Sequence, residues 1–376
     1  TMKIAVLTFW NSSDNYGQVL QGYALQKYLK KLGHEPYIVR YEEKKTYPDI
    51  FMERGLKAFI KRCIKWLLHH NNYKRQKNAF YKNKLRRFNI FKENIDYSDE
   101  RYYNYSDLVN RAPKADMYIT GSDQVWGRIP TMEKEQPYYL KFGNSATKRI
   151  AYAASIGSSD FFYRNPDVLA SLTKDFNKIS IRESSGLELF KKANIEATPV
   201  LDPVFLLSKE DYISLVKKPY NNSIFIYAVN INNGSEINID ELKELAKRKG
   251  LTLDATLSSG YFPFNECLGN INYVYPTIEE WIARIYGSEL VVTTSFHGIM
   301  FCLILHKKFA YIPLKSEYSK GNDRITSVLE MLGLTDRILQ TSYNDIIDKD
   351  ICWEDVDRVI KEKIELSKEF LHSCGC

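Results

Sequence analysis

The alternation of apolar runs with amphipathic helices constrains this chain most, because it continues over nearly its whole length. Residues 3–10 are mostly apolar, as expected for a buried parallel strand, and apolar residues then recur at helical spacing over 19–29. A second apolar run at 36–40 completes a strand–helix–strand unit. After a polar stretch near 217–222, the same alternation starts again at 224–229. We therefore predict an α/β protein with two Rossmann-like domains that face a cleft.

The length of the chain also favours two domains, because 376 residues are too many for one ordinary core. We place an N-terminal α/β domain at 2–217, with a basic helical insert at 51–92. A C-terminal α/β domain follows at 218–345, and a C-terminal helix with a tail occupies 346–376.

The cellular location follows from what the sequence lacks. No stretch of about 18 consecutive apolar residues occurs, and the first strand has no signal-peptide layout. The six cysteines are scattered, which fits a reducing compartment. A metal site built from His372, Cys374 and Cys376 is an alternative that we disfavour, since three ligands at a chain end hold a metal poorly. We expect a cytoplasmic protein without a metal.

Positive charge is concentrated in one segment. The formal net charge is +7, and residues 54–92 contain 13 Lys or Arg and no Asp or Glu, so the remaining residues carry a net negative charge. Three interpretations are open: an ordinary solvated helical face, a nucleic-acid surface, or contact with an anionic membrane. No nucleic-acid-binding motif occurs, so we expect no nucleic acid. We favour peripheral contact with the inner face of the membrane.

Residues 290–298 are the most informative for chemistry. A hydrophobic strand ends there, and the sequence Thr-Thr-Ser-Phe-His-Gly leads into an apolar helix. Free backbone N–H groups and the helix dipole at such a start favour an anion. We expect Ser295 to add a hydroxyl donor, Gly298 to allow close approach, and His297 to contact the anion or move a proton. The alternative is a histidine that caps the helix or lies in the core.

Cationic side chains elsewhere suit the same anion. The polar loop 319–324 contains Lys320 and Arg324, and a guanidinium binds an oxyanion through two hydrogen bonds. The alternative for Arg324 is a surface ion pair with a nearby carboxylate. Arg182 follows an apolar strand, where it either marks a solvated strand end or points across the cleft at the anion.

Two loops of the first domain suit a sugar. In the turn 121–126, the carboxylate of Asp123 accepts protons from hydroxyl groups and the indole of Trp126 offers a ring face. A structural turn with Trp126 in the core is the alternative. The loop after the first strand faces the same side. The candidates for acceptor binding are Asn15, Tyr16, Gly17, Ser122 and Trp126.

Taken in order, these motifs resemble those of the polysaccharide pyruvyl transferases. The matching segments are Asn-Tyr-Gly (15–17), Gly-Ser-Asp-Gln-Val-Trp (121–126), Tyr-Ala-x-Ser-x-Gly (152–157), Ser-x-Arg-Glu (180–183), Asp-Pro-Val-Phe (202–205), Thr-Ser-Phe-His-Gly (294–298) and Asn-Asp-Arg-Ile (322–325). Each motif is weak alone, but seven in order are specific for the family.

The resemblance implies a fold like that of two-domain, GT-B-type glycosyltransferases. It implies phosphoenolpyruvate as a co-substrate bound mainly by the second domain, with no other cofactor, and a sugar acceptor that is often linked to a lipid diphosphate. By position, His297 and Arg182 match the family's donor-contacting histidine and arginine. Several members carry Arg where this chain has Ser295, so Arg324 or Lys320 would supply that cation. His297 is then the candidate acid, and Asp123 the candidate base.

Two other functions compete with pyruvyl transfer to a cell-surface or capsular polysaccharide precursor. One is a GT-B-type glycosyltransferase that uses a sugar nucleotide. It predicts charged residues that grip a ribose in the second domain, and we find no convincing pair. The other is a non-catalytic glycan-binding protein, which the joint presence of His297, Arg182 and Arg324 disfavours.

Overall fold

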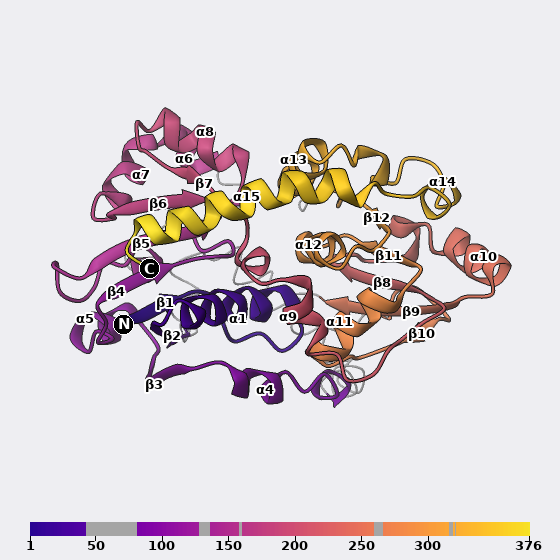
Figure 1. Cartoon of the computed structure of the whole chain (residues 1–376), viewed down its shortest axis with the longest axis horizontal. Helices are drawn as coiled ribbons and strands as arrows, with labels where there is room; N and C mark the ends of the chain where they lie inside the picture. Colours follow the sequence, from indigo (N-terminus) through magenta and orange to yellow (C-terminus); the bar gives the residue numbers. More distant parts are fainter. Residues whose placement is uncertain (43–80, 128–135, 158–159, 259–265, 316–318, 320) are drawn as a thin grey trace, which may run out of the picture.

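The computed structural model describes residues 1–42, 81–127, 136–157, 160–258, 266–315, 319 and 321–376. Two parallel sheets lie side by side, each flanked by helices (Figure 1). Within the described residues, the first sheet has seven strands in the order β3-β2-β1-β4-β5-β6-β7, and the second has five in the order β10-β9-β8-β11-β12. The prediction of an α/β protein with two Rossmann-like units is confirmed.

The elements of the first domain are β1 (Lys3–Leu7), α1 (Tyr16–Lys31), β2 (Glu35–Tyr41), α4 (Phe88–Phe91), η1 (Lys92–Asn94), β3 (Tyr97–Tyr102), α5 (Tyr105–Asn110), β4 (Met117–Thr120), η2 (Gln136–Tyr139), β5 (Lys148–Ala154), α6 (Asp160–Arg164), α7 (Pro166–Thr173), β6 (Lys178–Ile181), α8 (Ser184–Lys192), β7 (Thr198–Pro199), η3 (Pro203–Leu206) and α9 (Lys209–Ile213). The central strands are buried on both faces, which explains why they read as continuous apolar runs.

The elements that follow are β8 (Ser223–Val229), η4 (Gly234–Ile237), α10 (Ile239–Lys249), β9 (Thr252–Ser258), β10 (Asn272–Tyr273), α11 (Ile278–Gly287), β11 (Leu290–Thr293), α12 (Phe296–Ile304), β12 (Phe309–Tyr311), α13 (Asp323–Met331), η6 (Thr335–Arg337), α14 (Asn344–Ile347) and α15 (Trp353–Ser373). The predicted domain boundary at 217/218 falls between α9 and β8. Thr277 starts α11 with a capping box to Glu280, and Gly250 ends α10 in a left-handed conformation.

In each sheet, the order in which the chain adds strands reverses at one point, the switch point. In the first sheet the chain steps outward from β1 to β2 on one side and from β1 to β4 on the other. In the second sheet, β8 and β11 are the corresponding pair. In open parallel sheets, ligands bind beside the carboxyl ends of the strands at such a switch point. The loops that follow β1, β4, β8 and β11 are therefore the expected places for a site.

The two domains share one hydrophobic core where α1 meets the second domain. Tyr16, at the start of α1, is fully buried and stacks on Trp281 of α11, with ring centroids 5.0 Å apart and planes at 9°. Its hydroxyl donates to the carbonyl of Pro276 and accepts from Arg86 at 2.6 Å. The guanidinium of Arg86 also donates to Thr256 Oγ1 and the Leu257 carbonyl, each at 2.8 Å. Arg86 thus connects both domains.

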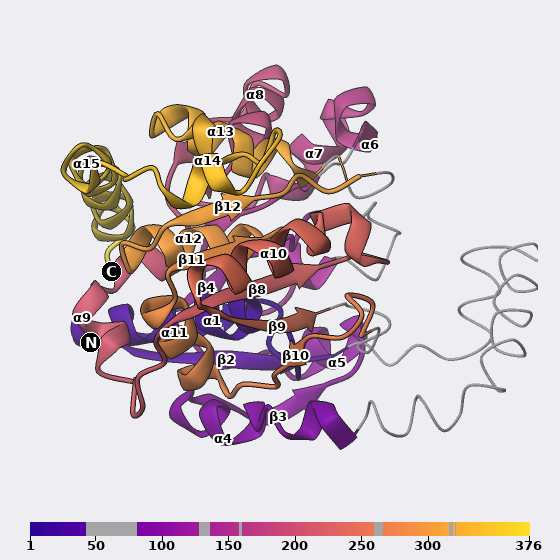
Figure 2. The same cartoon turned by 90° about the vertical axis from the view of Figure 1, so that its right-hand side faces the viewer.

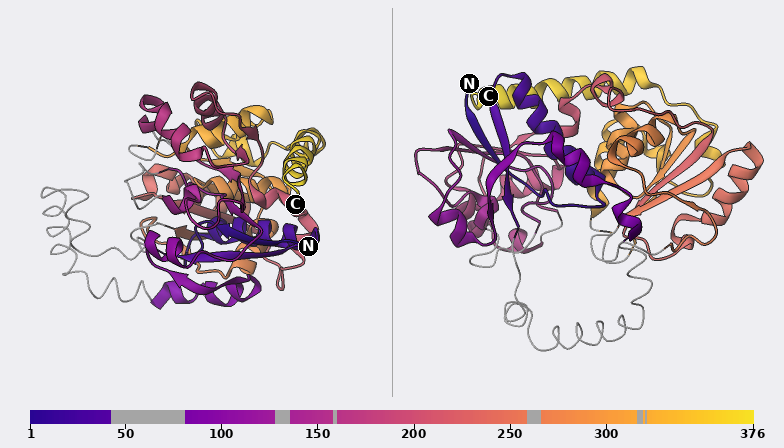
Figure 3. Two further views of the ribbon diagram at one scale, coloured as in Figure 1. Left: turned by 90° about the vertical axis from the view of Figure 1, so that its left-hand side faces the viewer. Right: turned by 90° about the horizontal axis from the view of Figure 1, so that it is seen from below.

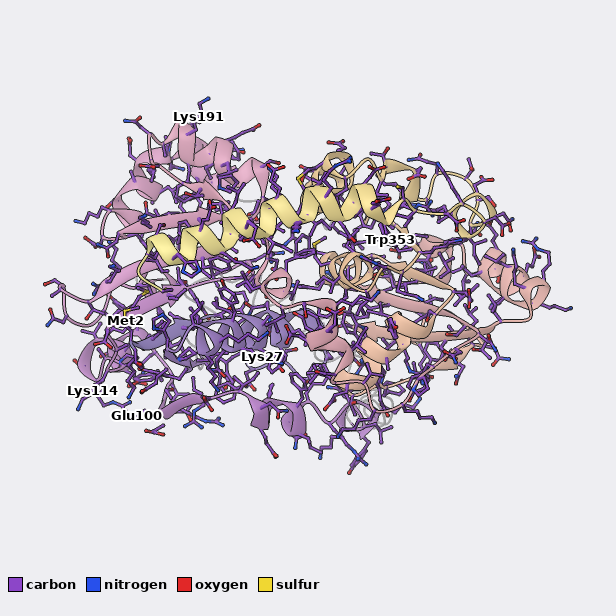
Figure 4. The ribbon with its side chains drawn as sticks, viewed as in Figure 1. Met2, Lys27, Glu100, Lys114, Lys191 and Trp353 are labelled. Atoms are coloured by element: carbon purple, nitrogen blue, oxygen red, sulfur yellow. The ribbon has the colours of Figure 1, made fainter. Side chains whose placement is uncertain are left out.

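Helix α15 returns from the second domain to the first and lies across both (Figures 1 and 3). Trp353, labelled in Figure 4 at the start of this helix, stacks on His306 at 4.8 Å. Toward the other end, Ser367 Oγ accepts from the Leu201 amide at 2.9 Å, and Lys148 Nζ donates to the Cys374 carbonyl at 2.9 Å. The predicted C-terminal helix therefore packs on both domains rather than on the second alone.

The basic segment 54–92 lies mostly outside the described residues. In its described part, Arg86 is 1 % exposed and serves the domain junction, whereas Lys84 and Arg87 are exposed. None of the helices in the described residues combines the length and the apolar character that crossing a bilayer requires.

Candidate active site

The N-termini of two helices meet at the domain junction, one from each switch point. Helix α1 follows β1, and its N-cap Asn15 accepts from the Gln18 amide at 3.1 Å. Helix α12 follows β11, and its N-cap Ser295 accepts weakly from the Gly298 amide at 3.4 Å. Among the described residues, nothing accepts from the backbone N–H of Phe296, so this helix start keeps a donor free for an anion.

Gly17 and His297 bring the two domains into direct contact. A Cβ atom placed on Gly17 would lie 2.1 Å from Cγ of His297, so only glycine fits there. The imidazole side chain is 9 % exposed. At this point the two domains touch and leave no gap, and His297 stands between α1 and the end of the first domain.

Asp202 is the centre of the polar cluster next to His297. It caps η3 in the first domain and is 2 % exposed. Its Oδ2 atom accepts from Arg182 Nη1 at 2.7 Å and from Ser122 Oγ at 2.9 Å, and it lies 3.5 Å from His297 Nε2. Among the described residues, His297 Nε2 makes no hydrogen bond of good geometry. One buried carboxylate therefore faces groups from the residue after β6, from the loop after β4 and from α12.

The charges around Asp202 stabilise its ionised form. Burial alone would raise the pKa of this carboxyl group, but the imidazole of His297 and the guanidinium of Arg182 hold the pKa of Asp202 well below its usual value. For Arg182, burial opposes the charged form, whereas the carboxylates of Asp202, Glu183 and Asp123 raise its pKa. Arg182 therefore stays charged although its side chain is 2 % exposed.

A second guanidinium approaches from the other domain. Arg182 and Arg324 lie beside the same ring, that of Phe296, at 4.6 and 5.8 Å from its centroid. With the Gln124 amide oriented so that its oxygen faces Arg324, that oxygen accepts from Nη1 and Nη2 at 2.8 and 2.9 Å. Burial and the positive charge of Arg182 lower the pKa of Arg324. Among the described residues, no carboxylate lies within ion-pair distance of Arg324.

Asp123 and Glu183 complete the cluster. Asp123 is 3.9 Å from Arg182 and accepts from Gln18 Nε2 at 3.4 Å, and its side chain is 14 % exposed. Glu183 accepts from the amide of Ile156 at 2.7 Å and lies 3.7 Å from Nε of Arg182. Glu183 therefore holds the guanidinium in place, whereas Asp123 is the more accessible acid.

Comparison with models of protein families shows to which family the chain belongs. A family model for polysaccharide pyruvyl transferase matches residues 15–316. The chain belongs to the polysaccharide pyruvyl transferase family. No curated protein matches it. The matched region begins at the cap of α1, after β1, and includes β4, the switch point of the second sheet and the contact of Gly17 with His297.

Solved structures share the fold of this family member at low sequence identity. The UDP-N-acetylglucosamine 2-epimerase from Rickettsia bellii is 9 % identical, with a TM-score of 0.56 over 99 % of this chain and 95 % of that one. The UDP-GlcNAc 2-epimerase from Neisseria meningitidis bound to UDP-GlcNAc is 11 % identical, with a TM-score of 0.51 over 98 % and 100 %. A putative UDP-N-acetylglucosamine 2-epimerase from Listeria monocytogenes is 10 % identical, with a TM-score of 0.51 over 99 % and 95 %. These likenesses support the predicted GT-B-like architecture.

The structure places three predicted site residues differently from our expectation. Trp126 is fully buried, stacks on Tyr139 at 5.3 Å and offers no ring face to a sugar. Tyr16 is equally buried in the junction between the domains. At Gly298 a Cβ atom would lie 2.3 Å from Thr293 Oγ1, so this glycine allows the helix to pack on β11 and not a ligand to approach. Lys320 lies outside the described residues.

Of the other candidates, the structure brings His297, Arg182, Arg324, Asp123 and Ser122 into one cluster with Gly17. Sequence reasoning missed three members: Asp202, Phe296 and Gln124. All three stand inside motifs that we quoted for the family, but only the folded chain shows which atoms they face. Within the described ranges, no three His, Cys, Asp or Glu side chains come together as metal ligands would.

Proposed function

We propose that this chain transfers the enolpyruvyl unit of phosphoenolpyruvate onto a sugar and closes it into a cyclic ketal. The observation that carries the proposal is the pair of guanidinium groups on Phe296. Arg182 comes from the first domain and Arg324 from the second, and Arg324 has no carboxylate partner among the described residues. A half-buried positive charge with no carboxylate within ion-pair distance favours an anionic ligand.

The donor has two anionic groups, a phosphate and a carboxylate, and the cluster has matching donors. Arg324 presents a planar fork of N–H groups, which suits either group. The free N–H of Phe296 at the start of α12 adds a backbone donor next to it. We assign the donor to the space between Arg324 and the start of α12. Ser295 caps this helix and so shapes the anion site, rather than supplying a charge as arginine would.

The chemistry needs one proton donor and a group that accepts protons from the sugar. His297 protonates the methylene carbon of phosphoenolpyruvate, which leaves positive charge on C2. A sugar hydroxyl then attacks C2 and gives its proton to Asp123. A second hydroxyl of the same sugar displaces inorganic phosphate from C2, and the ketal closes as that hydroxyl proton leaves with the phosphate. Phosphoenolpyruvate is a co-substrate, and the scheme assigns no step to a resident cofactor.

Asp202 supports this reaction through His297 and Arg182. Its carboxylate contacts both side chains. It therefore fixes the position of the imidazole of His297 relative to the guanidinium of Arg182. Ser122 holds the same carboxylate from the loop after β4. Asp202 is therefore a positioning residue in this scheme, and the groups that touch the donor are the histidine and the two arginines.

The acceptor in this proposal is a sugar of a cell-surface or capsular polysaccharide precursor, linked to a lipid diphosphate on the cytoplasmic side of the membrane. Asp123 and the loop that carries Asn15 lie on the first domain, at the carboxyl ends of β4 and β1. With Trp126 and Tyr16 buried, these polar groups are the remaining described candidates to contact the sugar.

The decisive experiment incubates the protein with phosphoenolpyruvate and a panel of synthetic and lipid-linked glycosides. We expect phosphate release together with a mass gain of one pyruvyl ketal. The His297→Ala variant should lose both while keeping its fold by circular dichroism. His372→Ala, which changes an exposed histidine on α15, is the matched control and should keep activity. Activity of His297→Ala close to that of the control would overturn the assignment of the acid.

A thermal-shift panel separates this function from its competitors. A ligand that binds the folded state raises the melting temperature in proportion to the logarithm of its concentration over Kd. We expect phosphoenolpyruvate to stabilise the protein, and the Arg324→Ala variant to lose this effect. Stabilisation by sugar nucleotides and not by phosphoenolpyruvate would instead indicate a glycosyltransferase.

A further inference from the structure

The side chain of Gln124 reaches from the first domain to the second. With its amide oxygen facing Arg324, that oxygen accepts from Nη1 and Nη2 at 2.8 and 2.9 Å. Gln124 lies in the loop after β4, and Arg324 lies in the first turn of α13. Figure 2 shows α13 next to α8, the helix of the first domain that begins directly after Glu183. One neutral amide therefore holds a guanidinium of the opposite domain where these two helices meet.

Both ends of this contact are anchored in their own domains. The backbone N–H of Gln124 donates to Asp123 Oδ1 at 2.8 Å. Its side chain has little room, because a Cβ atom on Gly157 would lie 3.3 Å from the end of the amide. In the second domain, Asn322 Nδ2 donates to the Leu314 carbonyl at 2.8 Å and holds the start of α13 in place. The fold of each domain thus determines where the amide and the guanidinium meet.

The contact uses only part of the Arg324 fork. A guanidinium has five N–H groups. The Nε–H of Arg324 donates to the Gly321 carbonyl at 3.3 Å, and one N–H from each Nη atom donates to Gln124. Within the described ranges, the second N–H of each Nη atom meets no acceptor. Two donors on one half-buried cation are therefore left for a ligand.

The acids of the cluster are placed on Arg182, whereas Arg324 receives the amide. Asp123 and Glu183 lie 3.9 and 3.7 Å from nitrogens of Arg182. A carboxylate in the place of the Gln124 amide would pair with Arg324 and neutralise its charge. The neutral amide oxygen orients the same two N–H groups and leaves the positive charge uncompensated. Glutamine at this position therefore fixes the direction of the fork without cancelling its attraction for an anion.

We propose that Gln124 is a positioning residue that holds Arg324 at the domain junction and keeps its charge available for an anionic ligand. The anion binds the two N–H groups of Arg324 that Gln124 leaves free. That the anion is the phosphate or the carboxylate of phosphoenolpyruvate rests on the proposed function. The contact between Gln124 and Arg324, and the need for a neutral side chain there, do not.

The first test measures Kd of the full chain for phosphoenolpyruvate and for inorganic phosphate by isothermal titration calorimetry. Gln124→Glu should weaken binding of both anions by about 30-fold or more, because its carboxylate pairs with Arg324 and repels the ligand. Gln124→Met keeps the length of the side chain but loses the oxygen, and should weaken binding only about 3- to 10-fold. Gln340→Glu adds the same charge at an exposed position and is the matched control, which should bind as the unaltered protein does.

The second test separates this role from a merely structural one by melting temperature. With Arg324 present, Gln124→Glu should keep or raise the melting temperature, since it replaces the amide contact with an ion pair. In the Arg324→Ala background, the same substitution should lower it, because the new carboxylate has lost its partner. Equal effects of Gln124→Glu in the two backgrounds would show that Gln124 and Arg324 do not interact and would overturn the proposal.

The remaining outcomes distinguish this inference from the proposed function. Anion binding by Gln124→Glu as tight as by Gln340→Glu would overturn the role of Gln124, even if the protein binds phosphoenolpyruvate. A lowered melting temperature of Gln124→Glu together with weak binding would reduce the role to a structural one and overturn it too. Binding of phosphate but not of phosphoenolpyruvate, lost in Gln124→Glu, would refute the proposed donor and support the inference. Binding of neither anion by the unaltered protein would overturn both.

Discussion

The imidazole of His297 rests directly on Gly17, so that a single methyl group added to Gly17 would lie 2.1 Å from Cγ of the ring. This contact joins the start of α1 in the first domain to the start of α12 in the second. Because each helix follows a strand next to a switch point, one glycine couples the position of the proposed acid to the arrangement of both domains.

Replacing Gly17 with alanine should therefore damage the site more than the fold. The clash forces the imidazole or the domain junction to move, and we expect a fall of about 100-fold in kcat/KM with a loss of about 1–3 kcal/mol in the free energy of unfolding. Steady-state kinetics and urea denaturation measure the two effects. Gly22→Ala in the same helix meets only the flexible end of Ile38, at 2.9 Å, and is the control. Equal activity of both variants would contradict the coupling.

Asp202→Asn should destabilise the protein in a pH-dependent way. The pKa of Asp202 is lower in the folded chain than the ordinary value of about 3.9 expected when unfolded. A lowered folded pKa stabilises the fold above about pH 4, and this contribution is lost as the pH falls through the folded value. At pH 7 we expect a loss of about 3 kcal/mol, because Arg182 loses its buried counter-ion.

The measurement is the free energy of unfolding of both proteins from pH 7 down to pH 3. The difference between them should be constant down to about pH 5 and should shrink below pH 4. A difference that stays the same at pH 3 would show that the charge of Asp202 does not provide the stability.

Arg324→Ala should weaken binding of phosphoenolpyruvate. The variant removes the cation that has no carboxylate partner among the described residues, and we expect KM for phosphoenolpyruvate to rise about 10- to 100-fold. Initial rates at varied phosphoenolpyruvate concentration and saturating acceptor measure this KM. Arg358 is an exposed arginine on α15 that pairs with Asp355, and Arg358→Ala should leave KM unchanged. An unchanged KM in Arg324→Ala would place the donor elsewhere.

Arg86→Met should loosen the junction between the domains. The variant removes hydrogen bonds to Tyr16, Thr256 and Leu257, and we expect a loss of about 2–4 kcal/mol in the free energy of unfolding. Chemical denaturation measures it. The neighbouring Arg87 is exposed, so Arg87→Met should change stability by less than about 0.5 kcal/mol. Similar effects of the two substitutions would mean that Arg86 does not hold the domains together.

Much of the fold could be predicted, because local apolar periodicity reports on elements whose faces are buried. The helical spacing found over 19–29 falls inside α1, Tyr16–Lys31, and the strand expected at 224–229 begins one residue earlier, at 223. Strand β3 could not be found in the same way. Its sequence Tyr-Ser-Asp-Glu-Arg-Tyr has three exposed polar residues in a row, since it is the edge strand of its sheet.

The site was only partly predictable, for a different reason. His297 and Arg182 stand at the ends of strands, and strand ends can be read from the sequence. Whether Trp126 faces a ligand or the core depends on Tyr139 and Phe190, whose positions follow from packing over long sequence distances. The same holds for Asp202, which meets His297 only because two domains come together.

The path of α15 has a consequence for how the protein is made. This helix packs on the first domain through Ser367 and Cys374, although the whole second domain precedes it in the chain. Because α15 is synthesised last, the surface of the first domain around Leu201 and Lys148 stays uncovered until the second domain has been synthesised. A fragment cut after the second sheet would therefore leave part of the first domain's surface uncovered, and adding residues 353–376 as a separate peptide should cover it again.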